Sequence, residues 1–461
     1  MRKLKNKKEL ILYAISPFGL HILNIIVSTY LINSFLVDNY VTDAEQWIYS
    51  DYTVVSVVLF AILVTFSKII ANIVDVPIAI GVDKIKSHYG RRRPAILIGL
   101  IITFSTFVLL MVPISQTPES IGNTIWFSLL LFAFYISYVM TLVSYYATFS
   151  EITKDEKDFA ILTKFKISID AFSFLLAYTL VPIFISFGYT VRGVAFLALP
   201  LSLMMIIPLF MIKEKSSLPQ DSMIEDYKEE EIDISKERYR KLGIRKSFLM
   251  IFKNKVFVIW IIIFTFLQIS LQLFMVSETV YFSGSLFFNG FKIALITLCV
   301  FLPIPLTNRI YKSIARRFGF KIAFIYSLAI FIIAIILMIG IYYVKDETTK
   351  LIFGVIAALI SSFGIGSFFS IGLVIPATIS KIEYKRTGIS YFAMFVGIES
   401  IVSNFFASLA TGALWLLLRH NNLVRIVPVI IVSCAFVALL FTFLLPKELS
   451  LYSKELLLEE D

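Results

Sequence analysis

The feature that most constrains this chain of 461 residues is a series of long apolar stretches separated by short polar segments. A helix needs about 20 apolar residues to cross the hydrocarbon of a bilayer. Only 16% of the residues are charged, against roughly 25% in soluble proteins. The sequence therefore predicts an all-α polytopic membrane protein with twelve transmembrane helices, at residues 10–37, 53–82, 94–115, 124–150, 161–186, 193–213, 255–283, 292–312, 321–344, 351–377, 389–418 and 425–446.

Cysteine and histidine are too few and too scattered to indicate a disulfide framework or a metal site. The two cysteines, Cys299 and Cys434, both lie in apolar stretches, and the three histidines are far apart. We expect no cofactor and no metal. No catalytic motif is present, so we expect no enzymatic activity.

The basic residues indicate the orientation of the chain. The N-terminus, the C-terminus and the loops after the even-numbered spans hold 35 of the 42 Lys and Arg residues, and the opposite loops hold 6. Because basic residues are retained on the cytoplasmic side, both termini are expected there, in a multi-pass protein of the cell membrane. The formal net charge of +10 is then explained by these loops, and no nucleic-acid partner is expected.

The longest polar stretch, residues 213–255, separates the sixth predicted span from the seventh. We interpret it as a solvated cytoplasmic linker, with a regulatory domain as the alternative. The predicted organisation is an N-terminal six-helix half at 1–212, the linker at 213–255, a C-terminal six-helix half at 256–446 and a cytoplasmic tail at 447–461.

The two halves resemble each other in one loop. Residues 83–94 follow the second span and residues 309–321 follow the eighth, and both loops are basic with a glycine, Gly90 or Gly319, before the next helix. Repeated six-helix halves are typical of secondary transporters with the major facilitator fold, which bind their substrate near the membrane midplane.

Four short motifs resemble those of the glycoside–pentoside–hexuronide:cation symporter family, which includes melibiose permease. The interval of seven residues from Asp83 to Gly90 is the family's, and the motifs lie at residues 75–94, 13–19, 151–156 and 384–393. The resemblance implies uptake of a sugar or glycoside coupled to H⁺, Na⁺ or Li⁺, by a chain that works as a monomer. A major facilitator carrier or exporter of a non-sugar solute is the alternative, and a receptor or membrane enzyme is a third class.

Charged residues within spans predict the coupling site, since charge at bilayer depth is costly and is usually functional. Lys68, Asn72 and Asp75 have the spacing of one helical face. The resemblance implies that Asp75 binds the cation, but Ala71 stands where the family has a second Asp. A single buried carboxylate favours H⁺ over Na⁺, because burial raises its pKa.

Glu399 is the second candidate for protonation, at a position where the family has a lysine. It is expected either to pair with Lys68 or to be satisfied by nearby polar side chains (Ser400, Ser403 and Asn404). For Lys68 and Asp75, the alternative to coupling is an internal ion pair with a structural role only.

The resemblance also implies a substrate site. His21 stands where the family has a sugar-binding Asp, and Leu142 where it has another, while Tyr138 and Tyr146 occupy matching aromatic positions. For His21, a packed polar residue is an equal alternative to a ligand contact. Weaker candidates are polar residues of the first, fifth and seventh spans: Asn24, Asp170 with Lys164 and Lys166, Gln268, Gln272, and Glu278, which is expected near the outer surface.

The loop after the second span is the predicted gating element. In the major facilitator fold such a loop pairs helix ends across the cytoplasmic face in the outward-facing state. Its candidate residues are Asp83, Gly90, Arg91, Arg92 and Arg93. Retention of positive charge on the cytoplasmic side is the alternative explanation for the three arginines.

Overall fold

A computed structural model describes residues 7–34, 54–115, 117–153, 156–212, 214, 254–387 and 392–446. The chain forms two compact units. Unit 1 comprises Met1–Lys228, Phe287–Ala294 and Gly412–Asn421, and unit 2 comprises Glu229–Leu286, Leu295–Thr411 and Asn422–Asp461. The linker predicted at 213–255 and the tail at 447–461 lie almost entirely outside the described residues.

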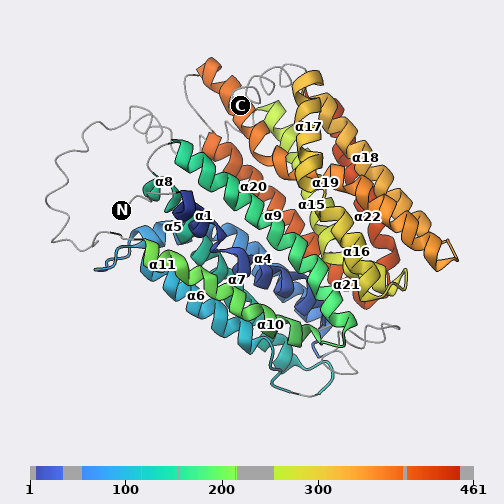
Figure 1. Cartoon of the computed structure of the whole chain (residues 1–461), viewed down its shortest axis with the longest axis horizontal. Helices are drawn as coiled ribbons and strands as arrows, with labels where there is room; N and C mark the ends of the chain where they lie inside the picture. The colour runs from blue at the N-terminus through green and yellow to red at the C-terminus, as the bar shows by residue number, and fades with distance from the viewer. Residues whose placement is uncertain are drawn as a thin grey trace. The chain divides into compact units, whose positions relative to one another are not determined.

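The described part of the chain is helical, with one isolated β-bridge between Val55 and Ser120. Figure 1 shows the helices coloured along the chain, from blue to red. The helices before the linker are α1 (Lys7–Ile15), α2 (Phe18–Ile25), the π-helix η1 (Ile26–Leu31), α3 (Ile32–Ser34), α4 (Val57–Ile73), α5 (Asp75–Asp83), α6 (Arg92–Leu109), α7 (Ile121–Tyr146), α8 (Phe149–Ile152), α9 (Glu156–Ser186), α10 (Val191–Ser202), the 3₁₀ turn η3 (Leu203–Ile206) and α11 (Ile207–Met211).

The helices after the linker follow the same pattern of long apolar segments with short connections. They are α15 (Lys255–Gly284), α16 (Gly290–Phe301), α17 (Ile304–Phe318), α18 (Phe320–Ile341), α19 (Glu347–Thr387), α20 (Phe392–Leu409), the π-helix η4 (Ala410–Leu414), α21 (Trp415–His420), the 3₁₀ turn η5 (Val424–Ile426) and α22 (Val427–Phe443).

Eleven of the described helical segments are long and apolar enough to cross a membrane. The second predicted span is the exception, because it is divided into α4 and α5 at Val74. Pro77 explains the break: it has no N–H, and its ring conflicts with the carbonyl four residues earlier, which belongs to Ile73 at the end of α4. With this divided span, the all-α polytopic fold predicted from the sequence is confirmed.

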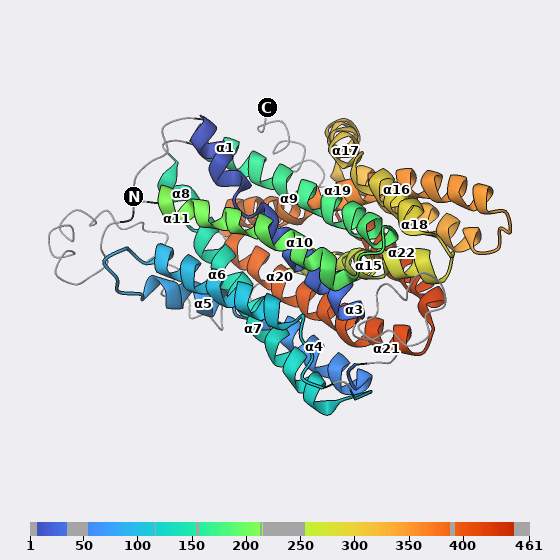
Figure 2. The ribbon, with the colours of Figure 1, turned by 60° about the horizontal axis from the view of Figure 1, so that its bottom comes forward.

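Small and hydroxylated residues let neighbouring spans pack closely, and they do so at equivalent places in the two units. In unit 1, α6 lies along α7 (Figures 1 and 2), where Thr103 and Ser137 join their hydroxyls at 2.9 Å. In unit 2, α18 lies along α19, and the hydroxyls of Ser327 and Ser367 are joined in the same way. Small residues drive helix association in a bilayer by allowing close packing.

The loops that resemble each other in sequence also share a backbone feature. Gly90 has φ of +86° and Gly319 has φ of +87°, and each stands immediately before a transmembrane helix or its cap. The ψ of Gly319 is 157°, a combination that is essentially restricted to glycine.

We predict that Gly319→Ala lowers the free energy of unfolding by about 1–3 kcal/mol, the cost of a side chain in that backbone region. The measurement is the midpoint of thermal unfolding of the purified protein in detergent. Gly340→Ala is the matched control, because Gly340 lies in α18 with nothing within 4 Å of an added Cβ. This control is expected to gain about 0.5–1 kcal/mol from helix propensity, and equal midpoints for the two variants would contradict the prediction.

Candidate functional site

The candidate substrate site of unit 1 draws on α2, α7 and α9. Pro17 forms the N-cap of α2, which places His21 in the first turns of that helix. Tyr138 and Tyr146 lie eight residues apart on α7, a spacing that keeps them near one face. The α9 residues Lys166 and Asp170 are one turn apart.

These five side chains form one connected polar cluster. The Nδ1 atom of His21 lies 2.8 Å from Tyr138 Oη, and its Nε2 atom lies 3.3 Å from Tyr146 Oη. Nε2 also lies 3.1 Å from Oδ1 of Asp170. The other oxygen of Asp170 pairs with Lys166 Nζ at 2.6 Å, and this ammonium lies 4.7 Å from the centroid of the Tyr146 ring. The structure thus brings His21, Tyr138 and Tyr146 together with Lys166 and Asp170, which were only weak candidates in the sequence.

The polar contacts of His21 run through both ring nitrogens. Nδ1 forms a hydrogen bond with Tyr138 Oη, in which Nδ1 accepts when it carries no hydrogen and donates when it carries one. Asp170 Oδ1 lies close to Nε2 and has no hydrogen-bond partner among the described residues, so this contact is a close approach of an imidazole and a carboxylate.

The cluster is partly exposed, although it lies on apolar helices. The exposed fraction of the side chain is 13% for His21, 24% for Asp170 and 28% for Lys166. Charged side chains on spanning helices face a water-filled space rather than lipid. A solute in such a space can reach the donors, acceptors and aromatic faces of this cluster.

The predicted coupling residues of the second span lie on both sides of its break. Lys68 and Asn72 belong to α4, are half-buried and both interact with other residues. Asp75 is the first residue of α5, and its side chain lies outside what the structure describes. Because the helix is interrupted at Val74, helical spacing alone does not place these three side chains on one face.

Glu399 lies in unit 2 and has a partner that the sequence did not indicate. The carboxylate is 4% exposed and accepts a hydrogen bond of 2.8 Å from the indole N–H of Trp260 on α15. Asn404 donates instead to Ser400, and Ser403 donates to a backbone carbonyl. No local sequence signal could have revealed the Trp260 contact, because the two residues are 139 positions apart.

The other predicted substrate residues are less involved in polar contacts. Asn24 and Gln268 are half-buried, and Gln272 is exposed. Their side chains make no hydrogen bond to another residue that the structure describes. Whether they contact a substrate remains a prediction from the sequence.

The predicted gating loop is held by a residue that sequence reasoning missed. Gly90 is buried, and a Cβ there would clash with the carboxylate of Glu214. Glu214 Oε2 accepts a hydrogen bond of 2.9 Å from the backbone N–H of Arg92, the first residue of α6. A carboxylate at a helix N-terminus is favourable because it satisfies a free N–H and opposes the helix dipole.

The remaining loop side chains lie at the surface of unit 1. Asp83 and Arg91 are exposed, and the Arg93 guanidinium lies 5.7 Å from the centroid of the Tyr89 ring. The loop conformation therefore depends on a glycine and on Glu214, in addition to the arginines that the sequence singled out.

We predict that Tyr138→Phe lowers the free energy of unfolding by about 0.5–1.5 kcal/mol, because the hydrogen bond to His21 is lost. Tyr135→Phe is the matched control on the same helix, since within the described residues the buried Tyr135 hydroxyl has no hydrogen-bond partner. Its removal is expected to be neutral or stabilising. Thermal unfolding of both variants tests this, and the idea fails if Tyr135→Phe is the more damaging change.

Comparison with known proteins identifies the fold and the family. The profile of the family described as MFS/sugar transport protein matches residues 12–444. No curated protein is detectably similar in sequence. Among solved structures, the D-xylose-proton symporter is similar with a TM-score of 0.64 and 13% identity, over 94% of this chain and 97% of that chain. The nucleoside transporter NupG gives a TM-score of 0.60 and 15% identity, over 95% of this chain and 98% of that chain.

These neighbours have the major facilitator fold, and both the family and the fold are those of membrane transporters. The resemblance to a sugar-transporting family of this superfamily, seen first in short motifs, is thereby confirmed. The chain belongs to the MFS/sugar transport protein family.

Proposed function

We propose that this protein is a proton-coupled symporter of a sugar or glycoside that works by alternating access. The observation that carries the proposal is the cluster of His21, Tyr138, Tyr146, Lys166 and Asp170. It combines a titratable imidazole, a carboxylate, an ammonium and aromatic rings, all partly exposed within unit 1.

The cluster has the chemistry that a pyranose or furanose requires. Sugar hydroxyls both donate and accept hydrogen bonds, and Asp170 can accept from two of them while Lys166 donates. The Tyr138 and Tyr146 rings offer apolar faces for the carbon side of a sugar ring. A few convergent polar groups beside aromatic surfaces are typical of small-molecule sites.

The same cluster supports a proton as the coupling ion. The Nδ1 atom of His21 can accept or donate a hydrogen in its contact with Tyr138, so the imidazole can carry one proton or two. Ala71 removes one of the two carboxylates that the symporter family uses for Na⁺. Na⁺ is the alternative coupling ion, and we propose H⁺.

Asp75 and Glu399 are the proposed sites that load the coupling proton, with Lys68 and Asn72 near Asp75 in sequence. Glu399 is buried with one N–H donor, from Trp260. Neutralising a buried carboxylate removes the cost of charge at bilayer depth, which lets the protein change conformation.

The alternative is a carrier of a non-sugar solute. The paired charges of Lys166 and Asp170 favour it, because they also suit a zwitterionic substrate. Nucleosides fall between the two possibilities, since they are themselves glycosides, and the structurally similar NupG is a nucleoside transporter.

The decisive measurement is proton movement in proteoliposomes during the addition of sugars, glycosides and nucleosides. For wild type we expect one compound to cause alkalinisation outside, as protons enter with it. Asp170→Asn is expected to abolish this signal, because both the partner of Lys166 and a hydroxyl acceptor are lost. Asp75→Asn is expected to abolish proton movement while the compound still binds.

Tyr135→Phe is the control, since its hydroxyl is outside the cluster. If no compound in the panel moves protons or competes for binding in wild type, with or without Na⁺, sugar symport is the wrong proposal. A zwitterionic solute that does move protons would instead support the alternative.

We also propose that the protein lies in the cell membrane with both termini on the cytoplasmic side, and that it acts as a monomer. The support for this orientation is the distribution of Lys and Arg between the two sets of loops. A reporter that fluoresces only in the cytoplasm is expected to be bright when fused after residue 461 and dark when inserted at Asn421 in the 421–423 turn. The reverse pattern would contradict the orientation.

A further inference from the structure

Glu278 is a buried carboxyl that the proposed function does not use. It lies on α15, six residues before that helix ends at Gly284, and is only 2% exposed. Its Oε1 atom accepts a hydrogen bond of 3.0 Å from the hydroxyl of Thr297 on α16. Its Oε2 atom is buried and has no hydrogen-bond partner among the described residues.

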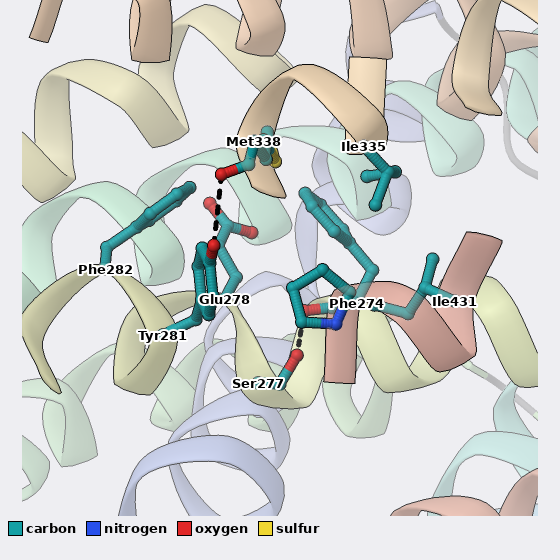
Figure 3. A pocket seen from close by; sticks show the side chains of 9 residues that line it. Phe274, Ser277, Glu278, Tyr281, Phe282, Ile335, Met338 and Ile431 are labelled. Atoms are coloured by element: carbon teal, nitrogen blue, oxygen red, sulfur yellow. Dashed lines mark hydrogen bonds between the residues drawn. The ribbon is translucent and has the colours of Figure 1, made fainter. Parts of the chain in front are cut away.

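The carboxyl lines a small cavity of unit 2, shown in Figure 3. Most of the lining is apolar, from α15, α18 and α22: Phe274, Phe282, Ile335, Met338, Pro428 and Ile431. The two hydroxyls that line the cavity are already engaged. Tyr281 donates to the Met338 carbonyl at 3.0 Å, and Ser277 donates to the Phe274 carbonyl at 3.4 Å, as the dashed lines of Figure 3 show.

The cavity beside Glu278 is about the size of one water molecule, which could accept a proton. Its volume is about 10 Å³, close to the roughly 10–15 Å³ that a single water molecule requires. The space is therefore suited to one water beside Glu278, and too small for a sugar. Glu278 is the only carboxyl among the residues that line it.

No basic side chain among the described residues forms an ion pair with this carboxyl, although Lys292 on α16 and Lys350 on α19 belong to neighbouring helices and are half-buried. Arg425 of η5 lies 4.6 Å from the centroid of the Tyr342 ring, which follows α18. Glu347 is the first residue of α19 and Asp346 comes directly before that helix; both side chains are exposed. Glu399 of α20 accepts a hydrogen bond from Trp260. Trp260 lies 18 positions before Glu278 on α15, about 27 Å along the helix, so Glu399 is far from Glu278.

The tyrosine and cysteine side chains nearest Glu278 are neutral groups. The Tyr281 hydroxyl donates its hydrogen bond to the Met338 carbonyl, and the thiols of Cys299 on α16 and Cys434 on α22 are half-buried. An ionised carboxylate that is buried without a cation and with one oxygen unsatisfied is costly. In a neutral carboxylic acid, Oε2 would carry a hydrogen and act as a donor. The cost of a buried negative charge would then be removed.

We propose that Glu278 is a proton-binding site of unit 2, separate from the cluster around His21. In the conformation described here it holds a proton on Oε2, and Thr297 donates to Oε1. Release breaks the O–H bond at Oε2 and passes the proton to a water in the cavity. The carboxylate that remains carries the full negative charge.

This site deepens the proposed function, because it names a place at which a proton can be bound during transport in addition to His21, Asp75 and Glu399. The charged carboxylate is unfavourable in its apolar cavity. Proton release is therefore coupled to a rearrangement of α15, α18 and α22 that admits water to Glu278. Of the two measurements described below, only proton movement in proteoliposomes rests on the proposed function; the infrared measurement does not.

The test is infrared difference spectroscopy of the reconstituted protein across a pH titration. A protonated carboxyl group has a C=O band that disappears when the group ionises. We expect wild type to show one such band that is lost in Glu278→Gln and kept in Glu347→Gln, the control at the exposed start of α19. Thr297→Val is expected to shift the same band, because the hydrogen bond to Oε1 is removed.

Identical spectra for wild type and Glu278→Gln would overturn the site, provided that both proteins unfold at similar temperatures. Glu278→Gln keeps the size of the side chain, and the unfolding temperature shows whether it is folded. In proteoliposomes Glu278→Gln is expected to exchange solute as wild type does, but to move fewer protons for each solute molecule transported. Unchanged proton movement would also count against the site, whereas a wild type that moves no protons but shows the band would refute the proposed function alone.

Discussion

The absence of water in the bilayer core is the constraint on which this structure depends. A polar group on a spanning helix is costly unless it finds a partner within the protein. Many Ser and Thr hydroxyls find one locally, by donating to the carbonyl three or four residues earlier, as Thr65 does to Ala61 and Ser34 to Leu31. Charged side chains pair either on one helix, as Lys166 and Asp170 do, or between helices, as His21 and Asp170 do. These few places are where function is to be sought.

The two units solve the packing problem in the same way. The pair Thr103 and Ser137 in unit 1 corresponds to Ser327 and Ser367 in unit 2, each between the third and fourth spans of its half. Gly90 and Gly319 share a positive φ before the third span of each half. Close helix packing of this kind holds neighbouring spans of each unit together.

Polar chemistry differs between the units. Unit 1 carries the connected and partly exposed cluster around His21, which suits contact with a solute. In unit 2, the carboxyls Glu399 and Glu278 are buried, and each has one hydrogen-bond donor among the described residues. Protonation of these buried carboxyls would be linked to solute binding in unit 1 through conformation. The link is physical because a buried charge changes the cost of each state.

The sequence by itself determined the all-α polytopic fold and the order of its long apolar segments, and it predicted their orientation. Hydropathy is a property of a local window, so its sum over about 20 residues decides whether a segment enters the bilayer. The resemblance in short motifs also led to His21, Tyr138 and Tyr146. The addition of Lys166 and Asp170 to that cluster depended on how α9 packs against α2.

Only the tertiary structure decided which polar groups meet. Trp260 reaches Glu399 and Tyr138 reaches His21 across more than a hundred residues, and the partner of Arg92 is Glu214. The rotation of each helix about its axis is set by packing against its neighbours, and a hydropathy pattern carries almost no information about it. The burial of Glu278 was hidden for the same reason, because it is settled by contacts that form only when the helices assemble. The break at Val74, in contrast, follows locally from Pro77.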